Sequence, residues 1–259
     1  MKAMIFAAGI GSRLKPFTLA HPKALVKVGG IPILQRVIMN IAHAGIKDIV
    51  VNVHHFAPQI VDFLKEHDNF GLNISISDES GCLLDTGGGF LAAEPLLRQG
   101  DRAEQILLHN ADILTDLPLD RMIDRHNATG ADVTLLCSRR NSSRTLYFNN
   151  ADGKLAGWEN ISRGEYRPDG FRPDMNVDPS PFDGVHIVSS RIFPYLRQYS
   201  LHAGDNPGGK DVFSIIPFYL ANLNNLDIRR YMLPDDCQWF DVGSADKLAV
   251  AEEFIATKL

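Results

Sequence analysis

Apolar residues recur along the first half of the chain in two alternating patterns. Short runs of strand length are separated by longer segments in which apolar residues return every three or four positions, as on one face of a helix. The runs predict strands at 3–8, 48–53, 72–77, 105–109 and 132–137, and the segments between them predict helices at 33–44, 58–66, 88–97 and 119–127. Such alternation is typical of an α/β fold with a mainly parallel sheet covered on both faces.

The pattern changes between Arg139 and Asp183. This stretch is rich in Asn, Arg, Gly, Pro and Asp, and its part 160–182 contains few large apolar residues. We interpret 139–183 as an insertion in a single domain spanning 1–259, either a flap beside the functional site or a surface loop without a role. Beyond it, strand patterns return at 184–189, 226–232 and 238–242, and helical patterns at 211–220 and 244–256.

Composition narrows the range of partners. The 259 residues carry a formal net charge of −5, which argues against broad binding to nucleic acid or to an anionic membrane. No apolar run approaches the roughly 20 residues that cross a bilayer, and the apolar start of the chain is too short for a signal peptide. The three cysteines lack the spacing of a zinc site or a disulfide framework, so we expect them to be buried and the protein to be cytoplasmic.

A glycine-containing loop follows the first predicted strand, at the sheet edge where parallel sheets bind ligands. It reads Ala7-Ala8-Gly9-Ile10-Gly11-Ser12-Arg13. Glycines allow a tight turn and a close approach of backbone N–H groups to phosphate oxygens, and an arginine can grip phosphate in a fork. The loop lacks the third glycine of a dinucleotide fingerprint and the Gly-Lys-Ser/Thr ending of a P-loop. Lys23, within Pro22-Lys23-Ala24-Leu25, offers a second positive charge on a stiff backbone, unless it is an ordinary surface lysine.

Taken together, this loop, the Pro16-Phe17-Thr18 step and Pro22-Lys23-Ala24-Leu25 resemble the signature of the sugar-nucleotide pyrophosphorylases. The resemblance implies a nucleotidyltransferase fold, a GT-A or Rossmann-like three-layer α/β sandwich with a mixed, mainly parallel central sheet. It also implies that Arg13 and Lys23 are catalytic, by holding pyrophosphate and neutralising phosphate charge. The loop residues implied to bind the nucleotide are Ala7, Ala8, Gly9, Gly11 and Ser12.

Further segments resemble the family's other landmarks. Asp85-Thr86-Gly87-Gly88-Gly89 is similar to the segment that faces the nucleobase, and it precedes a predicted helix whose N-terminus would offer free N–H groups. Asn110-Ala111-Asp112 and Trp239-Phe240-Asp241-Val242-Gly243 resemble the segments that hold Mg²⁺, a cation that prefers oxygen ligands. The resemblance therefore implies nucleotide contacts from Asp85, Thr86, Gly87, Gly88 and Asn110, and Mg²⁺ ligands at Asp112 and Asp241.

The sugar-binding segments match less completely. Phe182-Asp183-Gly184 resembles a segment that lines the sugar pocket, and Glu159 matches the acidic member of a Glu-Lys pair that binds sugar hydroxyls. The lysine of that pair is absent because Asn160 occupies its position. The implied sugar-binding residues are Glu159 and Gly184, and either Lys23 or Arg163 is expected to replace the missing charge.

The reaction implied is attack by a sugar 1-phosphate on the α-phosphorus of a nucleoside triphosphate, with loss of pyrophosphate and UTP favoured over GTP. Alternatives are a cytidylyltransferase acting on phosphocholine or a similar phosphate, and a catalytically silent nucleotide sensor. A dinucleotide-dependent oxidoreductase fits Arg13 and Lys23 poorly. No nucleic-acid or membrane partner is expected, and we expect a monomer or dimer.

Overall fold

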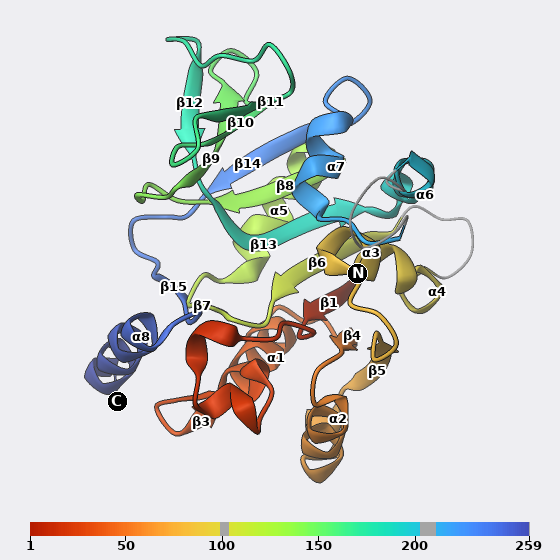
Figure 1. Ribbon diagram of the computed structural model, residues 1–259, viewed down its shortest axis with the longest axis vertical. Helices are drawn as coiled ribbons and strands as arrows, with labels where there is room; N and C mark the ends of the chain where they lie inside the picture. Colours follow the sequence, from red (N-terminus) through yellow and green to blue (C-terminus); the bar gives the residue numbers. More distant parts are fainter. Residues whose placement is uncertain (99–103, 203–210, 259) are drawn as a thin grey trace.

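The computed structural model describes residues 1–98, 104–202 and 211–258. Seven strands form the central sheet in the order β14-β8-β13-β6-β1-β4-β5 (Figure 1). All neighbouring strands are parallel except that β13 runs antiparallel to both β6 and β8. The strands are β1 (Lys2–Phe6), β4 (Asp48–Val53), β5 (Asn73–Asp78), β6 (Gln105–Asn110), β8 (Val133–Cys137), β13 (Phe182–Ser189) and β14 (Ile228–Met232). The mixed, mainly parallel sheet predicted from the sequence is therefore confirmed.

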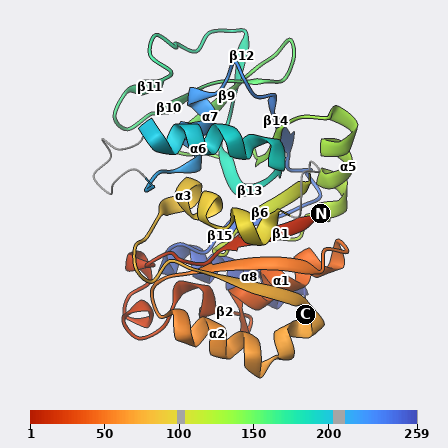
Figure 2. The ribbon, with the colours of Figure 1, turned by 90° about the vertical axis from the view of Figure 1, so that its right-hand side faces the viewer.

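Both faces of this sheet are buried, because successive side chains of a strand point to opposite faces. In β1, Ala3 and Ile5 belong to one apolar cluster, whereas Met4 belongs to the other. Helices α1 (Ile33–His43), α2 (Ala57–Glu66) and α5 (Leu119–Thr129) pack into the first cluster, and α3 (Asp85–Ala92), α4 (Glu94–Leu97), α6 (Phe193–His202) and α7 (Ile215–Ala221) into the second. Figure 2 shows α5 and α3 on opposite sides of the sheet, so the architecture is a three-layer sandwich.

Two short ladders lie outside the central sheet. The strand predicted at 238–242 is observed as β15 (Trp239–Asp241), which pairs with β7 (Ile113–Thr115) in an antiparallel two-stranded ladder. A second two-stranded ladder joins β2 (Lys27–Val28) to β3 (Ile31–Pro32). The last helix, α8 (Ala245–Lys258), begins four residues after β15 ends.

Two predicted helices differ in their limits. The helix predicted at 88–97 starts earlier, at Asp85, and is divided into α3 and α4, with Pro95 at the beginning of α4. Pro is tolerated at the first turn of a helix but disrupts its interior, which accounts for the division. The helix predicted at 211–220 begins only at Ile215, because Phe213 hydrogen-bonds to the start of α3 instead.

The insertion at 139–183 contains a second sheet and is not a structureless loop. Its four strands, in the order β11-β10-β9-β12, are all antiparallel and lie at the β14 end of the central sheet (Figure 1). They are β9 (Arg144–Asn149), β10 (Leu155–Asn160), β11 (Glu165–Arg167) and β12 (Val177–Ser180). Leu146 and Phe148 of β9 and Leu155 of β10 join the second apolar cluster, so this sheet is anchored to the core. Movement of the insertion as a flap stays a prediction.

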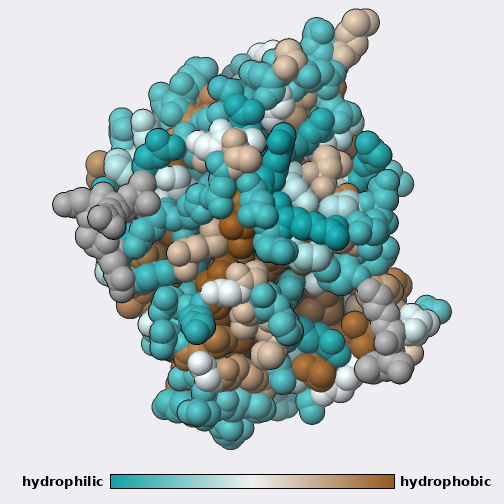
Figure 3. Space-filling view, turned by 180° about the vertical axis from the view of Figure 1, so that it is seen from behind, coloured by the Kyte–Doolittle hydropathy of each residue, from teal (hydrophilic) through white to brown (hydrophobic). Residues whose placement is uncertain are grey.

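The molecular surface and the cysteines can be compared with the expectations from composition. The face opposite to that of Figure 1 is largely hydrophilic, with hydrophobic residues showing mainly near its middle (Figure 3). Within the described ranges, no helix combines the length and the apolar character needed to cross a membrane. The three cysteines are free thiols, and Cys137 and Cys237 are buried as expected, whereas Cys82 is exposed.

Candidate active site

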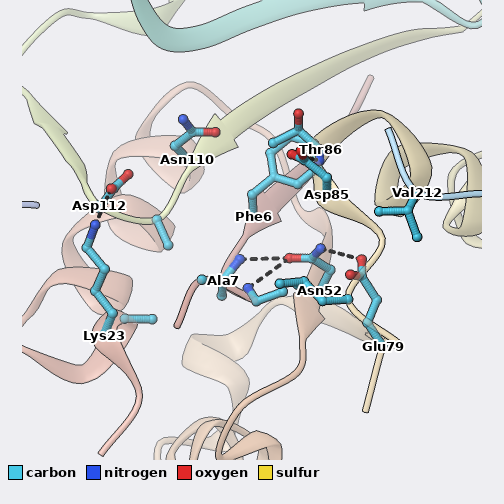
Figure 4. Close-up of a pocket in the computed structure, with 15 residues that line it drawn as sticks. Phe6, Ala7, Lys23, Asn52, Glu79, Asp85, Thr86, Asn110, Asp112 and Val212 are labelled. Carbon is cyan, nitrogen blue, oxygen red and sulfur yellow. Dashed lines mark hydrogen bonds and ion pairs between the residues drawn. The ribbon is translucent and has the colours of Figure 1, made fainter. Parts of the chain in front are cut away.

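Two adjoining cavities lie at the carboxyl ends of β1 and β6. The first, of about 390 Å³, is lined by the loop after β1, Lys23, Asn52 of β4, and residues that follow β5 and β6 (Figure 4). The second, of about 970 Å³, extends toward α7 and the second sheet. The described residues that line both cavities are Phe6, Asp85, Thr86, Asn110 and Val212. A ligand with two parts can therefore occupy both cavities at once.

A buried polar network fixes the loop after β1. The Asn52 side-chain oxygen accepts hydrogen bonds from the N–H groups of Ala7 (2.7 Å) and Ala8 (3.3 Å), and its amide nitrogen donates to Glu79 Oε1 (2.6 Å) (Figure 4). Glu79 Oε2 in turn accepts from the Leu84 N–H (3.1 Å). The N–H groups of Ala7 and Ala8 thus already have a protein partner and are not free to donate to a phosphate. Both residues still form part of the cavity wall.

Neither Asn52 nor Glu79 was identified from the sequence, although both line the first cavity and both are buried. Burial raises the pKa of the Glu79 carboxyl, and the hydrogen bonds from Leu84 and Asn52 oppose that shift. The only sequence signals were a polar residue inside the apolar run 48–53 and an acidic residue just after the next strand. Such positions at strand ends commonly carry ligand contacts.

The rest of the loop turns away from the first cavity. Gly11 has a positive φ of 67°, which favours glycine, and its carbonyl accepts a hydrogen bond from the Thr18 hydroxyl (2.8 Å). A Cβ on Gly11 would lie 2.9 Å from the Lys23 side chain, so the absence of a side chain at position 11 also leaves room for Lys23. Gly9 lines the first cavity, whereas Gly11 and Ser12 are not among the described residues that line it.

Asp112 and Asp241 are brought together by the β7–β15 ladder. Asp241 is paired with Ile113, and the Val242 N–H donates to the Asp112 carbonyl (2.8 Å). The Lys23 ammonium bonds to Asp112 Oδ2 (Figure 4), and the Lys247 ammonium bonds to Asp241 Oδ2. Asp112 lines the first cavity and Asp241 the second, so the two predicted metal ligands line adjoining cavities.

This pair of carboxylates fits Mg²⁺. The second oxygen of Asp241 is buried without a hydrogen-bond partner, and a cationic ammonium already bonds to each carboxylate. Within the described ranges, no group of three or more His, Cys, Asp or Glu side chains is arranged as a metal site. Mg²⁺ usually takes only one or two protein carboxylates and completes its coordination with water and substrate phosphates. Asp112 and Asp241 meet that requirement.

Arg13 approaches the same place from the short 3₁₀ helix at Ser12–Leu14. Arg13 and Asp241 both lie against Gly243. A Cβ added to this glycine would be 3.1 Å from Arg13 Nη2 and 2.6 Å from Asp241 Oδ1. The guanidinium is exposed and does not line either cavity in the described part of the chain. Arg13 therefore lies beside Asp241, and Lys23 bonds to Asp112, while the roles assigned to these four residues stay predictions.

The comparison with known proteins agrees with this geometry. Residues 2–148 match the family described as nucleotidyl transferase. The chain belongs to that family. An N-acetylmuramate α-1-phosphate uridylyltransferase from Caulobacter vibrioides is 28% identical over 98% of this chain and 96% of its own length.

Other relatives match over a shorter region. Mannose-1-phosphate guanyltransferases from Yarrowia lipolytica and Saccharomyces cerevisiae are 33% and 34% identical over 54% of this chain, and the match spans 38% of their own length. A solved structure of a putative glucose-1-phosphate thymidylyltransferase from Bacillus anthracis superposes with a TM-score of 0.76, covering 98% of this chain and 94% of that one. At 18% identity, that likeness establishes the fold alone.

In this nucleotidyltransferase, the glycines at the start of α3 have a packing role, and a nucleotide contact from them stays a prediction. The N–H groups of Gly87 and Gly88 donate to the Phe213 carbonyl (2.9 and 3.1 Å), so they are not the free donors expected at this helix N-terminus. A Cβ would lie 2.4 Å from the Phe213 ring at Gly87 and 2.0 Å from the Asp211 carbonyl oxygen at Gly88. These glycines allow the 211–213 segment to pack closely, and Asp85 and Thr86 are the residues of this turn that line the cavities.

The two predicted sugar-binding residues, Gly184 and Glu159, have different surroundings. Gly184, with φ of 78°, packs against Asn110: a Cβ on it would lie 2.8 Å from the Asn110 side-chain nitrogen. Glu159 points away from the second cavity, because it lies on β10 beside Trp158, which faces that cavity. The Tyr147 hydroxyl donates to Glu159 (2.5 Å), and burial together with this bond raises the pKa of Tyr147 to about 12. The structure does not bring Glu159 to the site.

The cations of the second cavity were missed by sequence reasoning. Arg163, one expected substitute for the missing lysine, is 69% exposed and pairs with Glu165 (3.8 Å). The described basic residues that line the second cavity are Arg140, Arg144, Arg167 and Lys247. Two histidines near the site are uncharged at neutral pH, since burial lowers the pKa of His109 to about 4 and that of His186 to about 3.

Replacing Asn52 by Asp will make stability fall steeply with rising pH. The new carboxylate keeps the acceptor for Ala7 and Ala8 but faces Glu79, so the pair will share a proton and its folded-state pKa will rise further above the unfolded value. A carboxyl whose pKa is raised by folding contributes stability at low pH that is lost as pH rises. Denaturant unfolding at pH 5 and pH 8 should show at least about 1.4 kcal/mol of extra loss, equal to one pKa unit. The exposed Asn127→Asp serves as control, and equal pH dependence in the two variants would contradict the network.

Replacing Gly88 by Ala will destabilise the fold, because the new Cβ meets a backbone carbonyl of the 211–213 segment. The expected loss in free energy of unfolding is about 1–3 kcal/mol, typical of overpacking. Gly81→Ala is the matched control, since nothing lies within 4 Å of a Cβ there. Thermal and denaturant unfolding measure the difference, and unchanged stability in Gly88→Ala would mean that the two segments are not packed as described.

Proposed function

We propose that this protein transfers a nucleoside monophosphate group from a nucleoside triphosphate, with UTP favoured, to a sugar 1-phosphate and releases pyrophosphate. The observation that carries the proposal is the β7–β15 ladder, which brings Asp112 of the first cavity next to Asp241 of the adjoining cavity, with Lys23 bonded to Asp112 and Arg13 beside Asp241. One cavity suits the nucleotide and the other suits the acceptor, with the reacting phosphates between them.

The chain's own residues account for most of the chemistry required. Both reactants are anions, so catalysis depends mainly on positioning and on offsetting negative charge. Lys23 neutralises phosphate charge from the first cavity, and Arg13 holds the departing pyrophosphate at its mouth. Asp112 and Asp241 would hold Mg²⁺, which supplies further positive charge at the reacting phosphates. The acceptor phosphate is already ionised at neutral pH, so no general base is needed.

The substrate pair we favour is UTP and N-acetylmuramate α-1-phosphate. One support is the uridylyltransferase relative, whose similarity covers nearly the whole of both chains. The other is the charge of the second cavity. Arg144 and Arg167 line it, and neither side chain has a carboxylate partner in the described part of the chain. They suit an acceptor that carries an acid group besides its phosphate. GTP with mannose 1-phosphate is the second candidate, supported by relatives that match over about half of this chain.

Pyrophosphate release identifies the substrates. The protein is mixed with Mg²⁺, each of the four nucleoside triphosphates, and N-acetylmuramate, N-acetylglucosamine, mannose or glucose 1-phosphate, with phosphocholine as a further acceptor. We expect UTP with N-acetylmuramate 1-phosphate to be fastest, and N-acetylglucosamine 1-phosphate, which lacks only the lactyl acid group, to be slower. Tight nucleotide binding without release in any mixture would support a silent sensor instead, and a preference for CTP and phosphocholine would support the cytidylyltransferase alternative.

Asp112→Asn and Asp241→Asn will each lower kcat by roughly 10²–10³-fold, the scale of losing one preorganised electrostatic contact in an active site. The fold will survive, since an amide has nearly the size and shape of the carboxylate it replaces, which circular dichroism checks. Removal of Mg²⁺ by a chelator should stop the wild-type reaction. Asp124→Asn, an exposed carboxylate on α5, is the control. Wild-type rates in both site variants would remove the metal assignment.

A cytoplasmic location is part of the same proposal, because a nucleoside triphosphate substrate is available there. Fractionation of the native cell with an antibody to the chain tests it.

A further inference from the structure

The phosphate of the acceptor needs a nearby cation. Neither of the two residues suggested by the sequence, Lys23 and Arg163, is placed to supply it. Lys23 lines the first cavity and bonds to Asp112, while Arg163 is exposed and does not line the second cavity in the described part of the chain. Asn160, at the position of the missing lysine, is buried, and its side-chain oxygen accepts a hydrogen bond from the Ser162 hydroxyl (2.9 Å). The compensating charge must therefore come from another part of the chain.

Arg140 lines the second cavity and is held in one orientation from three sides. Its Nε donates to Asp183 Oδ1 (2.8 Å), its Nη2 donates to the Phe182 carbonyl (2.9 Å), and its guanidinium lies over the Trp239 ring, 4.5 Å from the centroid. Nη1 has no protein partner in the described ranges, so it is left for a ligand. A guanidinium fixed in this way loses little conformational freedom when it binds an anion.

Asp183 anchors this arrangement from inside the protein. Its side chain is completely buried, and Oδ1 also accepts a hydrogen bond from the Ser138 hydroxyl (3.1 Å). Its backbone carbonyl accepts from the Trp239 indole N–H (2.8 Å), which ties the same residue to β15. Burial raises the pKa of the Asp183 carboxyl, and the hydrogen bonds from Arg140 and Ser138 oppose that shift. Arg140 and Asp183 therefore depend on each other for charge balance.

The same contacts place Arg140 beside the proposed metal ligands. Trp239 and Asp241 are two positions apart on β15, so their side chains leave the strand on the same face, with Cα atoms about 7 Å apart. Arg140 stacks on Trp239, and both Arg140 and Asp241 line the second cavity. A phosphate bound by Arg140 would thus lie next to the carboxylate that meets Asp112.

We propose that Arg140 binds the phosphate of the acceptor sugar and that Asp183 and Trp239 position it. Arg140 takes over the charge that the absent lysine at Asn160 would supply. This assignment rests on the proposed function, because it presumes that the second cavity receives a sugar phosphate. The proposed contact involves the acceptor sugar phosphate and not the nucleotide.

Steady-state kinetics with UTP and N-acetylmuramate 1-phosphate separates the two substrates. Arg140→Gln should raise the KM for the sugar phosphate about ten-fold or more, as expected for a lost charge-assisted contact, and leave the KM for UTP within about two-fold. Arg140→Lys, which keeps the charge but loses the fork, should fall between Gln and wild type. Arg163→Gln, the matched arginine outside the cavity, should match wild type.

A double-mutant cycle tests the positioning role of Asp183. Asp183→Asn should raise the acceptor KM less than Arg140→Gln does, and the combined variant should be no worse than Arg140→Gln alone, because Asp183 acts through Arg140. The combined variant also removes both charges of the ion pair, so it can fold even where Arg140→Gln leaves the buried Asp183 carboxylate unpaired and unfolds the protein. An unchanged acceptor KM in the folded combined variant, equal rises for both substrates, or the same rise in Arg163→Gln would overturn the proposal.

A binding measurement separates this proposal from the proposed function. Calorimetric titration of wild type and the combined variant with N-acetylmuramate 1-phosphate and with glucose 1-phosphate requires no turnover. Weaker binding in the variant supports Arg140 even where the wild type releases no pyrophosphate, which would mean that only the proposed reaction has failed. No difference between the two proteins with either sugar phosphate overturns the Arg140 assignment.

Discussion

The site depends on one short antiparallel ladder. β7 directly follows Asp112, and its pairing with β15 places Asp241 opposite Ile113, so two carboxylates far apart in sequence line adjoining cavities. Bringing like charges together costs free energy unless cations offset it. The ammonium groups of Lys23 and Lys247 bond to the two carboxylates, one to each. The same ladder carries Trp239, and through it the contacts to Arg140 and Asp183.

The antiparallel strand β13 connects this ladder with the acceptor side. It lies between β6 and β8 in the centre of the sheet, and it begins at Phe182 where the second sheet ends. Its register shifts between Phe182 and His186, and Gly184 within the shift packs against Asn110. An irregular start to an otherwise regular central strand lets the backbone of the site approach Asn110 closely, which a side chain at position 184 would prevent.

The local sequence pattern was sufficient to predict structure where a residue's neighbours in sequence determine its environment. The strand predicted at 48–53 is observed with the same limits, and the strand ends correctly located Asp112. The polar network of Asn52 and Glu79 escaped notice because its members come from different strands, and only the fold joins them. Gly88 was assigned to a ligand because its packing partner, Asp211, is far away in sequence. Glu159 was assigned from resemblance alone, and no strand was predicted at Leu155–Asn160, so the face of the strand on which its side chain lies could not be anticipated.

The two cavities differ in charge, and this difference gives each a role that the net charge of −5 conceals. Glu79, Asp85 and Asp112 line the first cavity with Lys23, so a triphosphate is better accommodated there with a divalent cation than without one. Among the described residues that line the second cavity, four side chains are cationic, and the carboxylates are those of Asp85 and Asp241. Lys247 and Arg140 are compensated by Asp241 and the buried Asp183, whereas Arg144 and Arg167 have no carboxylate partner within the described ranges. An acceptor that brings more than one negative charge would complete this balance, so the local arrangement of charge, rather than its total, determines which anion each cavity favours.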